Sequence, residues 1–375
     1  MRVLTISWLA RLFFGGVERR AHEFSNTLSA CGESVDLLCA RSPLAGPYPH
    51  PKKFRELNLW LPVHPYSLGW RWKARSEVAF TELCRLWLQR HRQDYDVVHA
   101  HGPSGWAGLK VKIPTIVDLQ TQDCSRYFQY RDRLNRYWAQ TLAGAQRILA
   151  ISARTRNSLI DNGIDGDRIA IVPNGVDVRR FREGDPEVAR QTLGLSPDKN
   201  YLLSVHQLVD KKRTFALMEM FVEFAREFSD YELLVCGDGP NRDLAAAWIR
   251  DRQLTNIRLL GYQSEILPHL YRLADAFVLC SDREGMPLVY LEALAAGLPI
   301  VATASGGTDE YLHHERNALV YPERDDASFL DGMQRLAREP QLRHDLAGQA
   351  AEDAWYYDWQ ALASQCQQLY AEVAS

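Results

Sequence analysis

Two glutamates and a proline form the part of the sequence with the clearest chemical potential. Glu284 and Glu292 stand eight residues apart, with Pro287 between them. A strand pattern at 276–279 and a helical pattern at 289–296 put Glu284 in a loop and Glu292 within the helix, if that helix begins near Pro287. Proline suits a first helical turn, where its missing N–H is not needed. Such a helix start attracts an anion such as a diphosphate, and a carboxylate on the same helix can accept hydrogen bonds from the two vicinal hydroxyls that a ribose offers.

A bare pair of glutamates at this spacing is more often two exposed side chains on an ordinary loop and helix. The functional interpretation therefore needs elements that bring other groups to the same place. Short apolar runs alternate with helical patterns, which is typical of parallel sheets covered by helices on both faces. In the first half the expected strands are residues 3–7, 35–39, 96–99, 115–118, 147–151 and 169–172. The pattern then restarts with expected strands at 201–205, 232–236, 257–260, 276–279 and 299–303.

The segment 173–197 is rich in Gly, Asp, Arg and Pro and is the natural join between the two halves. We expect an N-terminal Rossmann-like domain at 1–175, a second one at 176–354, and a final helix at 355–375 that packs back against the first. Ligands of open α/β sheets bind at the carboxyl ends of the strands. Two such domains facing each other predict a site in the cleft between them.

Several motifs, each weak alone, together resemble one family. They are Gly15-Gly16-Val17-Glu18, Val-Val-His-Ala-His at 97–101, Val-Pro-Asn-Gly-Val-Asp at 172–177, Gly-Asp-Gly-Pro at 237–240, and Glu284-x7-Glu292 with the segment 295–307. Over nearly the whole chain this set resembles the family 4 retaining glycosyltransferases. That family has the GT-B architecture of two facing Rossmann-like domains. The resemblance implies an α/β GT-B fold and transfer from a nucleoside-diphosphate sugar, with uridine the commonest nucleoside in the family.

The resemblance also implies roles for the matching residues. Glu292 would hold the donor ribose, and Glu284 would lie against the transferred sugar. The Gly15 and Gly16 loop would close over the diphosphate, because the backbone approaches closely where no side chain intervenes; a plain turn is the alternative. The backbone groups that meet the phosphates would come from Gly285, Met286, Pro287 and Leu288.

The next motif departs from the family. Where the family has Gly-Arg-Leu and then a lysine four residues beyond the leucine, this chain has His206 for the glycine, Gln207 for the arginine and Lys212 at the lysine position. Gln207 can donate hydrogen bonds to the donor but adds no charge. Lys211 or Arg213 could supply the missing charge. The departure indicates either a rearranged phosphate site or weakened activity.

His101 matches the family's histidine beside the transferred sugar, where it could bond a hydroxyl or share positive charge; a satisfied histidine at a strand end is the alternative. With retention and no obvious nucleophile, we expect a front-face mechanism in which the leaving diphosphate accepts the acceptor's proton. No Asp-x-Asp is placed as a metal clamp, so we expect no metal and no cofactor. A glycoside phosphorylase, a nucleotide-sugar epimerase and a nucleotide-sugar-binding protein without turnover remain alternative hypotheses.

The composition limits the kinds of partner that we expect for this protein. Among 375 residues, 46% are hydrophobic and 24% charged, as in an ordinary globular protein, and the net charge of −3 gives no reason to expect nucleic acid as a partner. The sequence has no signal-peptide pattern and no apolar run of about 18 residues. The seven cysteines lack CxxC spacing. We therefore expect reduced thiols in a cytoplasmic protein.

Aromatic and basic residues gather in the first domain, which faces the acceptor in this architecture. They are Trp60, Trp70, Arg71, Trp72, Lys73 and Arg75. We favour an amphipathic helix with a basic solvated face; peripheral contact with the inner face of the membrane, or a glycan platform, is the alternative. The sequence leaves the acceptor open among carbohydrate, lipid-linked and small-molecule hydroxyls.

Overall fold

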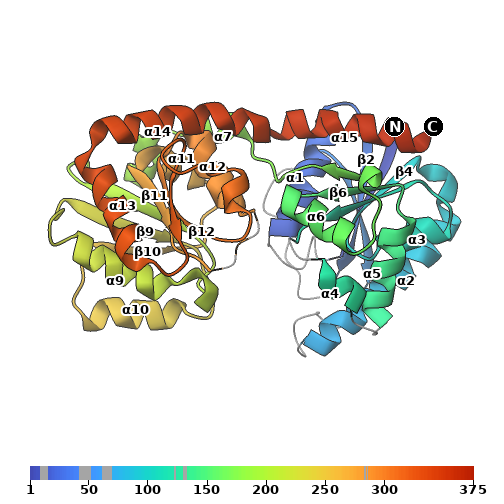
Figure 1. The fold of residues 1–375 in the computed structure, drawn as a ribbon, viewed down its shortest axis with the longest axis horizontal. Coiled ribbons are helices and arrows are strands. Elements are labelled where there is room, and N and C mark those ends of the chain that lie inside the picture. Colours follow the sequence, from blue (N-terminus) through green and yellow to red (C-terminus); the bar gives the residue numbers. More distant parts are fainter. Residues whose placement is uncertain are drawn as a thin grey trace. The chain divides into compact units, whose positions relative to one another are not determined.

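Two compact units make up the described part of the chain. The computed structural model describes residues 1–8, 16–41, 52–60, 70–121, 124–129, 133–282, 284 and 286–375. One unit consists of residues 1–174 with 359–375, and the other of residues 175–358. Each is a parallel sheet with helices on both faces (Figure 1), so the expected pair of Rossmann-like folds is confirmed.

The sheet of the first unit has seven strands in the order β3-β2-β1-β4-β5-β6-β7. Successive residues of a strand point to opposite faces. Val3 therefore packs with Phe24 of helix α1 (Gly16–Ala30) on one face, while Leu4 packs with Phe80 of helix α2 (Trp70–Arg90) on the other. Burial on both faces explains why these strands are apolar throughout. The strands are β1 (Arg2–Ser7), β2 (Ser34–Arg41), β3 (Arg55–Trp60), β4 (Val97–His101), β5 (Thr115–Leu119), β6 (Arg147–Ala150) and β7 (Ile169–Ile171).

The last helix of the chain belongs to this first unit. Trp359, Leu362 and Tyr370 of α15 (Trp359–Ala374) join the same buried cluster as Phe24. Helix α15 therefore packs in the same cluster as α1, although the two helices come from opposite ends of the sequence. The other helices of the unit are α1 (Gly16–Ala30), α2 (Trp70–Arg90), α3 (Gly105–Lys110), α4 (Ser125–Gln129), α5 (Arg133–Gly144) and α6 (Ala153–Asp161).

The sheet of the second unit has six strands in the order β10-β9-β8-β11-β12-β13. Leu217 and Phe221 of helix α9 and Phe329 of helix α13 cover one face of it. Its strands are β8 (Asn200–Val205), β9 (Tyr231–Cys236), β10 (Ile257–Gly261), β11 (Ala276–Leu279), β12 (Ile300–Ala304) and β13 (Leu319–Pro322). Its helices are α7 (Val178–Arg182), α8 (Pro186–Leu193), α9 (Thr214–Phe224), α10 (Arg242–Asp251), α11 (Leu267–Leu273), α12 (Leu288–Ala296), α13 (Asp326–Arg338) and α14 (Pro340–Asp353).

The strand order reverses once in each sheet, between β1 and β4 in the first and between β8 and β11 in the second. At such a switch point the connections leave toward opposite faces of the sheet, and a crevice opens at the carboxyl ends of the two strands. His101 ends β4, the loop with Lys212 follows β8, and the loop with Glu284 follows β11. Both switch points therefore carry polar residues singled out by the sequence.

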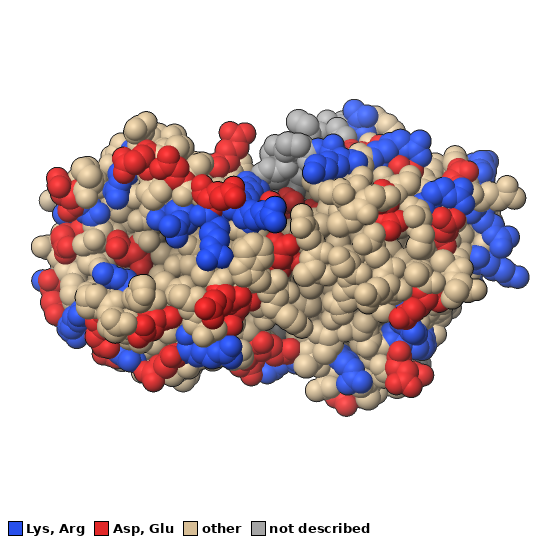
Figure 2. Space-filling view, turned by 90° about the horizontal axis from the view of Figure 1, so that it is seen from above, with Lys and Arg blue, Asp and Glu red and all other residues tan. Residues whose placement is uncertain are grey.

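The surface carries charges of both signs. Lys and Arg are interspersed with Asp and Glu over the face in Figure 2, in keeping with a net charge of −3. All seven cysteines are free, and all but Cys31 are buried. Among the described residues, none of the helices has the length and hydropathy needed to cross a bilayer.

Candidate functional site

In the second unit, Glu284 lies in the loop after β11 and is held by the end of the next strand. Its backbone N–H donates to Ser305 Oγ at 2.5 Å, and the Thr303 hydroxyl donates to the carbonyl of Ser281 at 2.6 Å. The Glu284 side chain is buried. Because β12 fixes the loop on both sides of Asp282, the carboxylate of Glu284 has a defined position.

Lys212 meets this carboxylate. The sequence singled the two residues out separately, and the structure puts Lys212 Nζ 2.6 Å from Glu284 Oε1. Lys212 is also buried; burial lowers the pKa of its ammonium group, and the charge of Glu284 opposes that shift. The result is a buried ion pair at the β8–β11 switch point, with its cation on one loop and its anion on the other.

Helix α12 begins directly after this pair. Pro287 occupies the N-cap position, one residue before the expected helical turn, and no described side chain caps the helix. The helix is apolar around its whole circumference, since Leu288 and the residues from 290 to 296 are buried. Met286 is buried as well. The start of α12 thus offers backbone rather than side-chain groups. Gly285 lies outside the described residues.

Glu292 is a buried carboxylate in the middle of α12. Its Oε2 accepts a hydrogen bond from the Tyr271 hydroxyl at 2.9 Å. Tyr271 belongs to α11, and its ring stacks on Phe277 of β11. The sequence did not point to Tyr271, because a tyrosine in an apolar helix is usually a buried core residue. Its hydroxyl orients a carboxylate that would otherwise be buried in an apolar helix.

The motif that departs from the family has a structural explanation at His206. Its Nδ1 lies 3.0 Å from Ser204 Oγ and its Nε2 lies 2.9 Å from Thr214 Oγ1, so the ring joins β8 to α9. Burial lowers the pKa of His206 to about 3, with a further contribution from the charge of Lys212. His206 is therefore a neutral structural residue, whereas Gln207 beside it is exposed.

Neither candidate for the missing charge is engaged with the ion pair. Lys211 is exposed. The guanidinium of Arg213 donates to Asp326 at 2.9 Å and lies 3.8 Å from Asp282. Arg213 is thereby committed to two carboxylates, which leaves Lys212 as the cation against Glu284 in the described part of these loops.

In the first unit, His101 lies at the carboxyl end of β4. It is buried, and its Nδ1 is 3.7 Å from Asp118 Oδ2. Neither ring nitrogen has a hydrogen-bond partner among the described residues. Burial lowers the pKa of His101 to about 3, although Asp118 acts in the opposite direction. The lowered pKa favours the neutral ring over the imidazolium, which was one of the two forms the resemblance left open for His101.

His99, His101 and Asp118 could together offer ligand atoms to a metal, since these atoms lie within 4.8 Å of one another. The fully buried guanidinium of Arg20, however, donates from Nε to Asp118 Oδ2 at 2.8 Å. Arg20 already neutralises the carboxylate, and a divalent cation there would face a buried positive charge. We interpret the group as a hydrogen-bonded cluster.

The remaining sequence candidates in the first unit are only partly described. Gly16 begins α1 and is exposed, whereas Gly15 lies outside the described residues. Trp60 is exposed at the end of β3, with the Arg41 guanidinium 5.7 Å from its ring centre. The side chains of Trp70, Arg71 and Lys73 also lie outside the description.

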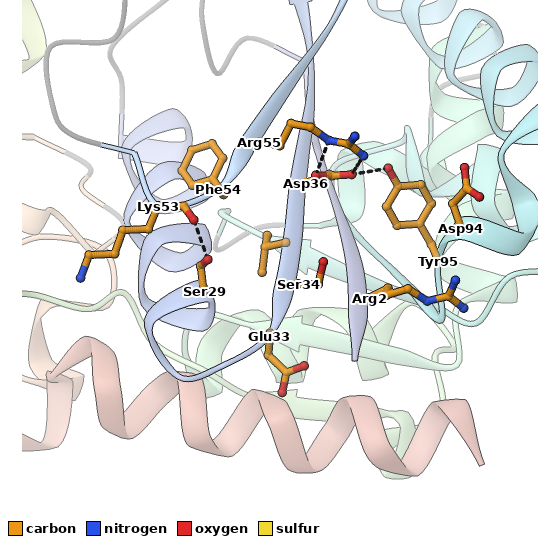
Figure 3. Close-up of a pocket in the computed structure, with 11 residues that line it drawn as sticks. Arg2, Ser29, Glu33, Ser34, Asp36, Lys53, Phe54, Arg55, Asp94 and Tyr95 are labelled. Atoms are coloured by element: carbon orange, nitrogen blue, oxygen red, sulfur yellow. Dashed lines mark hydrogen bonds and ion pairs between the residues drawn. The ribbon is translucent and has the colours of Figure 1, made fainter.

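A pocket of about 680 Å³ lies at the opposite, amino edge of the first sheet (Figure 3). The starts of β1, β2 and β3 line it. Its charges pair with one another: Arg55 Nε donates to Asp36 at 2.9 Å, and the Tyr95 hydroxyl donates to the same carboxylate at 2.6 Å. We assign this pocket no role in the chemistry, because it lies at the end of the strands opposite the switch point of the first sheet.

Comparison with known proteins identifies relatives over both units. The family described as "Glycosyltransferase Family 4" matches residues 14–180, and "Glycosyl transferases group 1" matches residues 185–353. D-inositol 3-phosphate glycosyltransferase of Frankia alni is 33% identical over 249 residues, which are 63% of this chain and 61% of that protein.

Two solved structures share the fold. Sucrose-phosphate synthase from Thermosynechococcus elongatus matches with a TM-score of 0.79 at 20% identity, over 100% of this chain and 99% of that one. HepE of Anabaena, in complex with UDP and glucose, matches with a TM-score of 0.77 at 16% identity, over 99% of both chains. At these identities the likeness establishes the GT-B architecture alone.

Proposed function

The chain belongs to family 4 of the glycosyltransferases, and from that premise we propose that it transfers a sugar from a nucleoside-diphosphate sugar to an acceptor hydroxyl with retention of configuration. The observation that carries the proposal is the buried ion pair of Lys212 and Glu284 at 2.6 Å, four residues before α12 begins. A cation, a carboxylate and an uncapped helix start are the groups that a diphosphate and a sugar require together.

The donor would lie along α12. Glu292 accepts hydrogen bonds from the ribose hydroxyls, with Tyr271 holding the carboxylate in place. Backbone groups of residues 285–288 meet the diphosphate, and Lys212 neutralises it. Glu284 accepts hydrogen bonds from hydroxyls of the transferred sugar. Gln207 donates to the phosphates without adding charge.

The chemistry would proceed on one face of the sugar. The bond from the anomeric carbon to the diphosphate oxygen breaks, and the acceptor oxygen bonds to the same carbon from the same side. The departing diphosphate oxygen takes the acceptor's proton. Lys212 stabilises the charge that develops on the diphosphate, which is the main electrostatic contribution of the protein. We propose that this needs no metal ion, and unchanged turnover in excess chelator is the expected result.

Two observations bear on the substrates. HepE was solved with UDP and glucose, and we propose uridine as the nucleoside here too. The Frankia relative carries an inositol phosphate in its name, and we propose a carbohydrate, a lipid-linked glycan or a small polyol as the acceptor. Gly15 and Gly16 would close over the diphosphate, and His101 would bond a sugar hydroxyl. Peripheral membrane contact through the first unit remains a proposal for the lipid-linked case.

The ribose role of Glu292 can be tested by a double-mutant cycle with the ligand. We expect Glu292→Gln to weaken UDP binding about ten- to a hundredfold, because charged hydrogen bonds contribute about 1.5–3 kcal/mol each. Calorimetric titration with UDP and with 2′-deoxy-UDP gives the four affinities. If Glu292 holds the ribose, removing the 2′-hydroxyl costs much less in the variant than in the wild type.

A matched control is Glu219→Gln, which alters an exposed glutamate on α9 of the same unit. It should leave both affinities unchanged. An equal penalty for the missing hydroxyl in wild type and Glu292→Gln would refute the ribose role. Binding of the UDP-sugar without any release of UDP would instead support a protein that holds the donor without transferring its sugar. Dependence of sugar release on inorganic phosphate would identify a phosphorylase.

A further inference from the structure

Four buried side chains connect His101 to the last helix of the chain. Arg20 comes from α1, His99 from β4, Asp118 from β5 and Tyr370 from α15. All four are buried within the first unit. Buried polar groups of this kind must satisfy one another, and their hydrogen bonds fix where each proton sits.

Asp118 is the fixed point of the cluster. Its Oδ2 accepts from Arg20 Nε at 2.8 Å, and its Oδ1 accepts from Gln120 Nε2 at 2.6 Å. Arg20 also donates to the carbonyls of Val172 and Pro173, which holds the guanidinium in place. Burial opposes ionisation of Asp118, but Arg20, His101 and His99 together outweigh it and keep the pKa of the carboxyl group low. The carboxylate is therefore an acceptor only.

This acceptor sets the tautomer of His99. Its Nε2 lies 3.4 Å from Asp118 Oδ2, so the proton of a neutral ring belongs on Nε2. The other nitrogen, Nδ1, then has a lone pair, and it accepts from the Tyr370 hydroxyl at 2.5 Å. In the opposite tautomer a lone pair would face the carboxylate. Tyr370 and Asp118 thus hold His99 from its two ends.

His99 and Asp118 in turn define the surroundings of His101. The two imidazole rings stack with their centres 5.0 Å apart and 15° between their planes. The Nδ1 of His101 is turned toward Asp118 at 3.7 Å. A neutral His101 is most stable with its proton on Nδ1, next to the negative charge. Its Nε2 then carries a lone pair that no described residue uses.

We propose that Tyr370 is a positioning residue which, through His99 and Asp118, holds His101 with Nε2 as a hydrogen-bond acceptor for a substrate hydroxyl. This inference rests on the proposed transfer function. It makes His101 an acceptor for a hydroxyl proton rather than a donor or a cation. It also gives the C-terminal helix a part in the chemistry, since its tyrosine is 271 positions from His99 in the sequence.

The proton positions can be measured without substrate. Long-range ¹H–¹⁵N correlation spectra of the full chain, labelled with ¹⁵N-histidine, distinguish the two neutral tautomers from the imidazolium. His99→Gln and His101→Gln assign the signals. At pH 7 we expect His99 with its proton on Nε2 and His101 with its proton on Nδ1. The wild-type protein alone decides this point, whatever the stability of the variants.

Tyr370→Phe then tests the positioning role. It removes one hydroxyl and keeps the ring. We expect the His99 Nδ1 signal to move toward that of an unbonded nitrogen, and kcat to fall about fivefold with the KM for the donor unchanged, the effect of one lost hydrogen bond. Tyr201→Phe is the matched control: the Tyr201 hydroxyl donates to the carbonyl of Ser196 at 2.9 Å in the other unit. It should change neither the spectra nor kcat.

The outcomes separate this inference from the function on which it rests. A protonated His101 at pH 7, or one with its proton on Nε2, overturns the inference. So does a Tyr370→Phe variant with wild-type spectra and wild-type kcat. The expected tautomers in a protein that transfers no sugar to any acceptor would overturn the proposed function and leave the proton assignment standing.

Discussion

Gln207 is the residue at which this chain departs most from the phosphate motif of its family. Its side chain is exposed, and nearby Arg213 is engaged by Asp326. An arginine at position 207 would add a second cation to the one that Lys212 supplies. One added charge in a partly exposed site contributes about 1 kcal/mol. We therefore expect Gln207→Arg to tighten UDP binding about fivefold in calorimetric titrations at low salt.

The gain should shrink as salt is raised, because an exposed charge is screened. Gln341→Arg, an equal change of charge at an exposed position of α14, provides the control and should leave the affinity unchanged. Equal affinities of wild type and Gln207→Arg would indicate that the loop after β8 does not reach the phosphates.

Spacing drew attention to Glu284 and Glu292, and the family resemblance singled out Lys212 and His101. They could not identify the residues that hold these groups. Arg20 and Asp118 are 98 positions apart, and their contact depends on β1 lying between β2 and β4. A contact that depends on the order of strands in a sheet leaves no local pattern in the sequence.

Among the elements, the loop after β9 packs tightly against the segment that carries Gln207. A Cβ on Gly237 would lie 1.8 Å from the carbonyl oxygen of His206, and Gly237 has a φ of 144°. A side chain there must push the segment 206–208 away. We expect Gly237→Ala to destabilise the second unit by about 2 kcal/mol or more and to weaken UDP binding, because Gln207 moves with the segment. Urea unfolding and titration measure the two effects.

Gly348→Ala is the matched substitution for this comparison. Gly348 lies in helix α14, and a Cβ there would meet no atom within 4 Å. Alanine is a better helix former than glycine, so this variant should gain about 0.5–1 kcal/mol and bind UDP as the wild type does. Equal behaviour of the two variants would contradict the close packing at Gly237.

The strands that the sequence did not predict are β3 and β13, each at an edge of its sheet. A central strand of these sheets is buried on both faces and reads as a continuous apolar run. Residues 55–60 of β3 are instead half-buried or exposed, and Arg55, Glu56 and Asn58 interrupt the apolar positions. An edge strand gets its pairing from one neighbour only, so its own sequence carries a weaker signal.

At the scale of the whole molecule, each unit contains a buried histidine with a strongly lowered pKa. Burial lowers the pKa of His101 and of His206 from 6.5 to about 3. Asp118, His99 and Arg20 surround the first ring, and Lys212 is the charged group at the second. Below pH 6.5 the unfolded chain takes up a proton at each position, and the folded chain does not until about pH 3. Stability contributed by these rings is therefore present above pH 6.5 and is lost as the pH falls toward 3.

Each ring should lower the free energy of unfolding by about 1.4 kcal/mol for every pH unit below 6.5, which amounts to about 2 kcal/mol at pH 5. Urea unfolding from pH 7 to pH 5 measures the slope. His206→Gln should reduce the pH dependence of the free energy of unfolding of the second unit by about one proton, and His101→Gln should do the same for the first unit. Because the two units can unfold separately, each is followed with its own probe. Exposed His344 on α14 serves as the control, since His344→Gln should leave both slopes unchanged. A slope unaffected by both buried substitutions would mean that the two rings accept protons in the folded protein, and His101 would then be free to act as a cation.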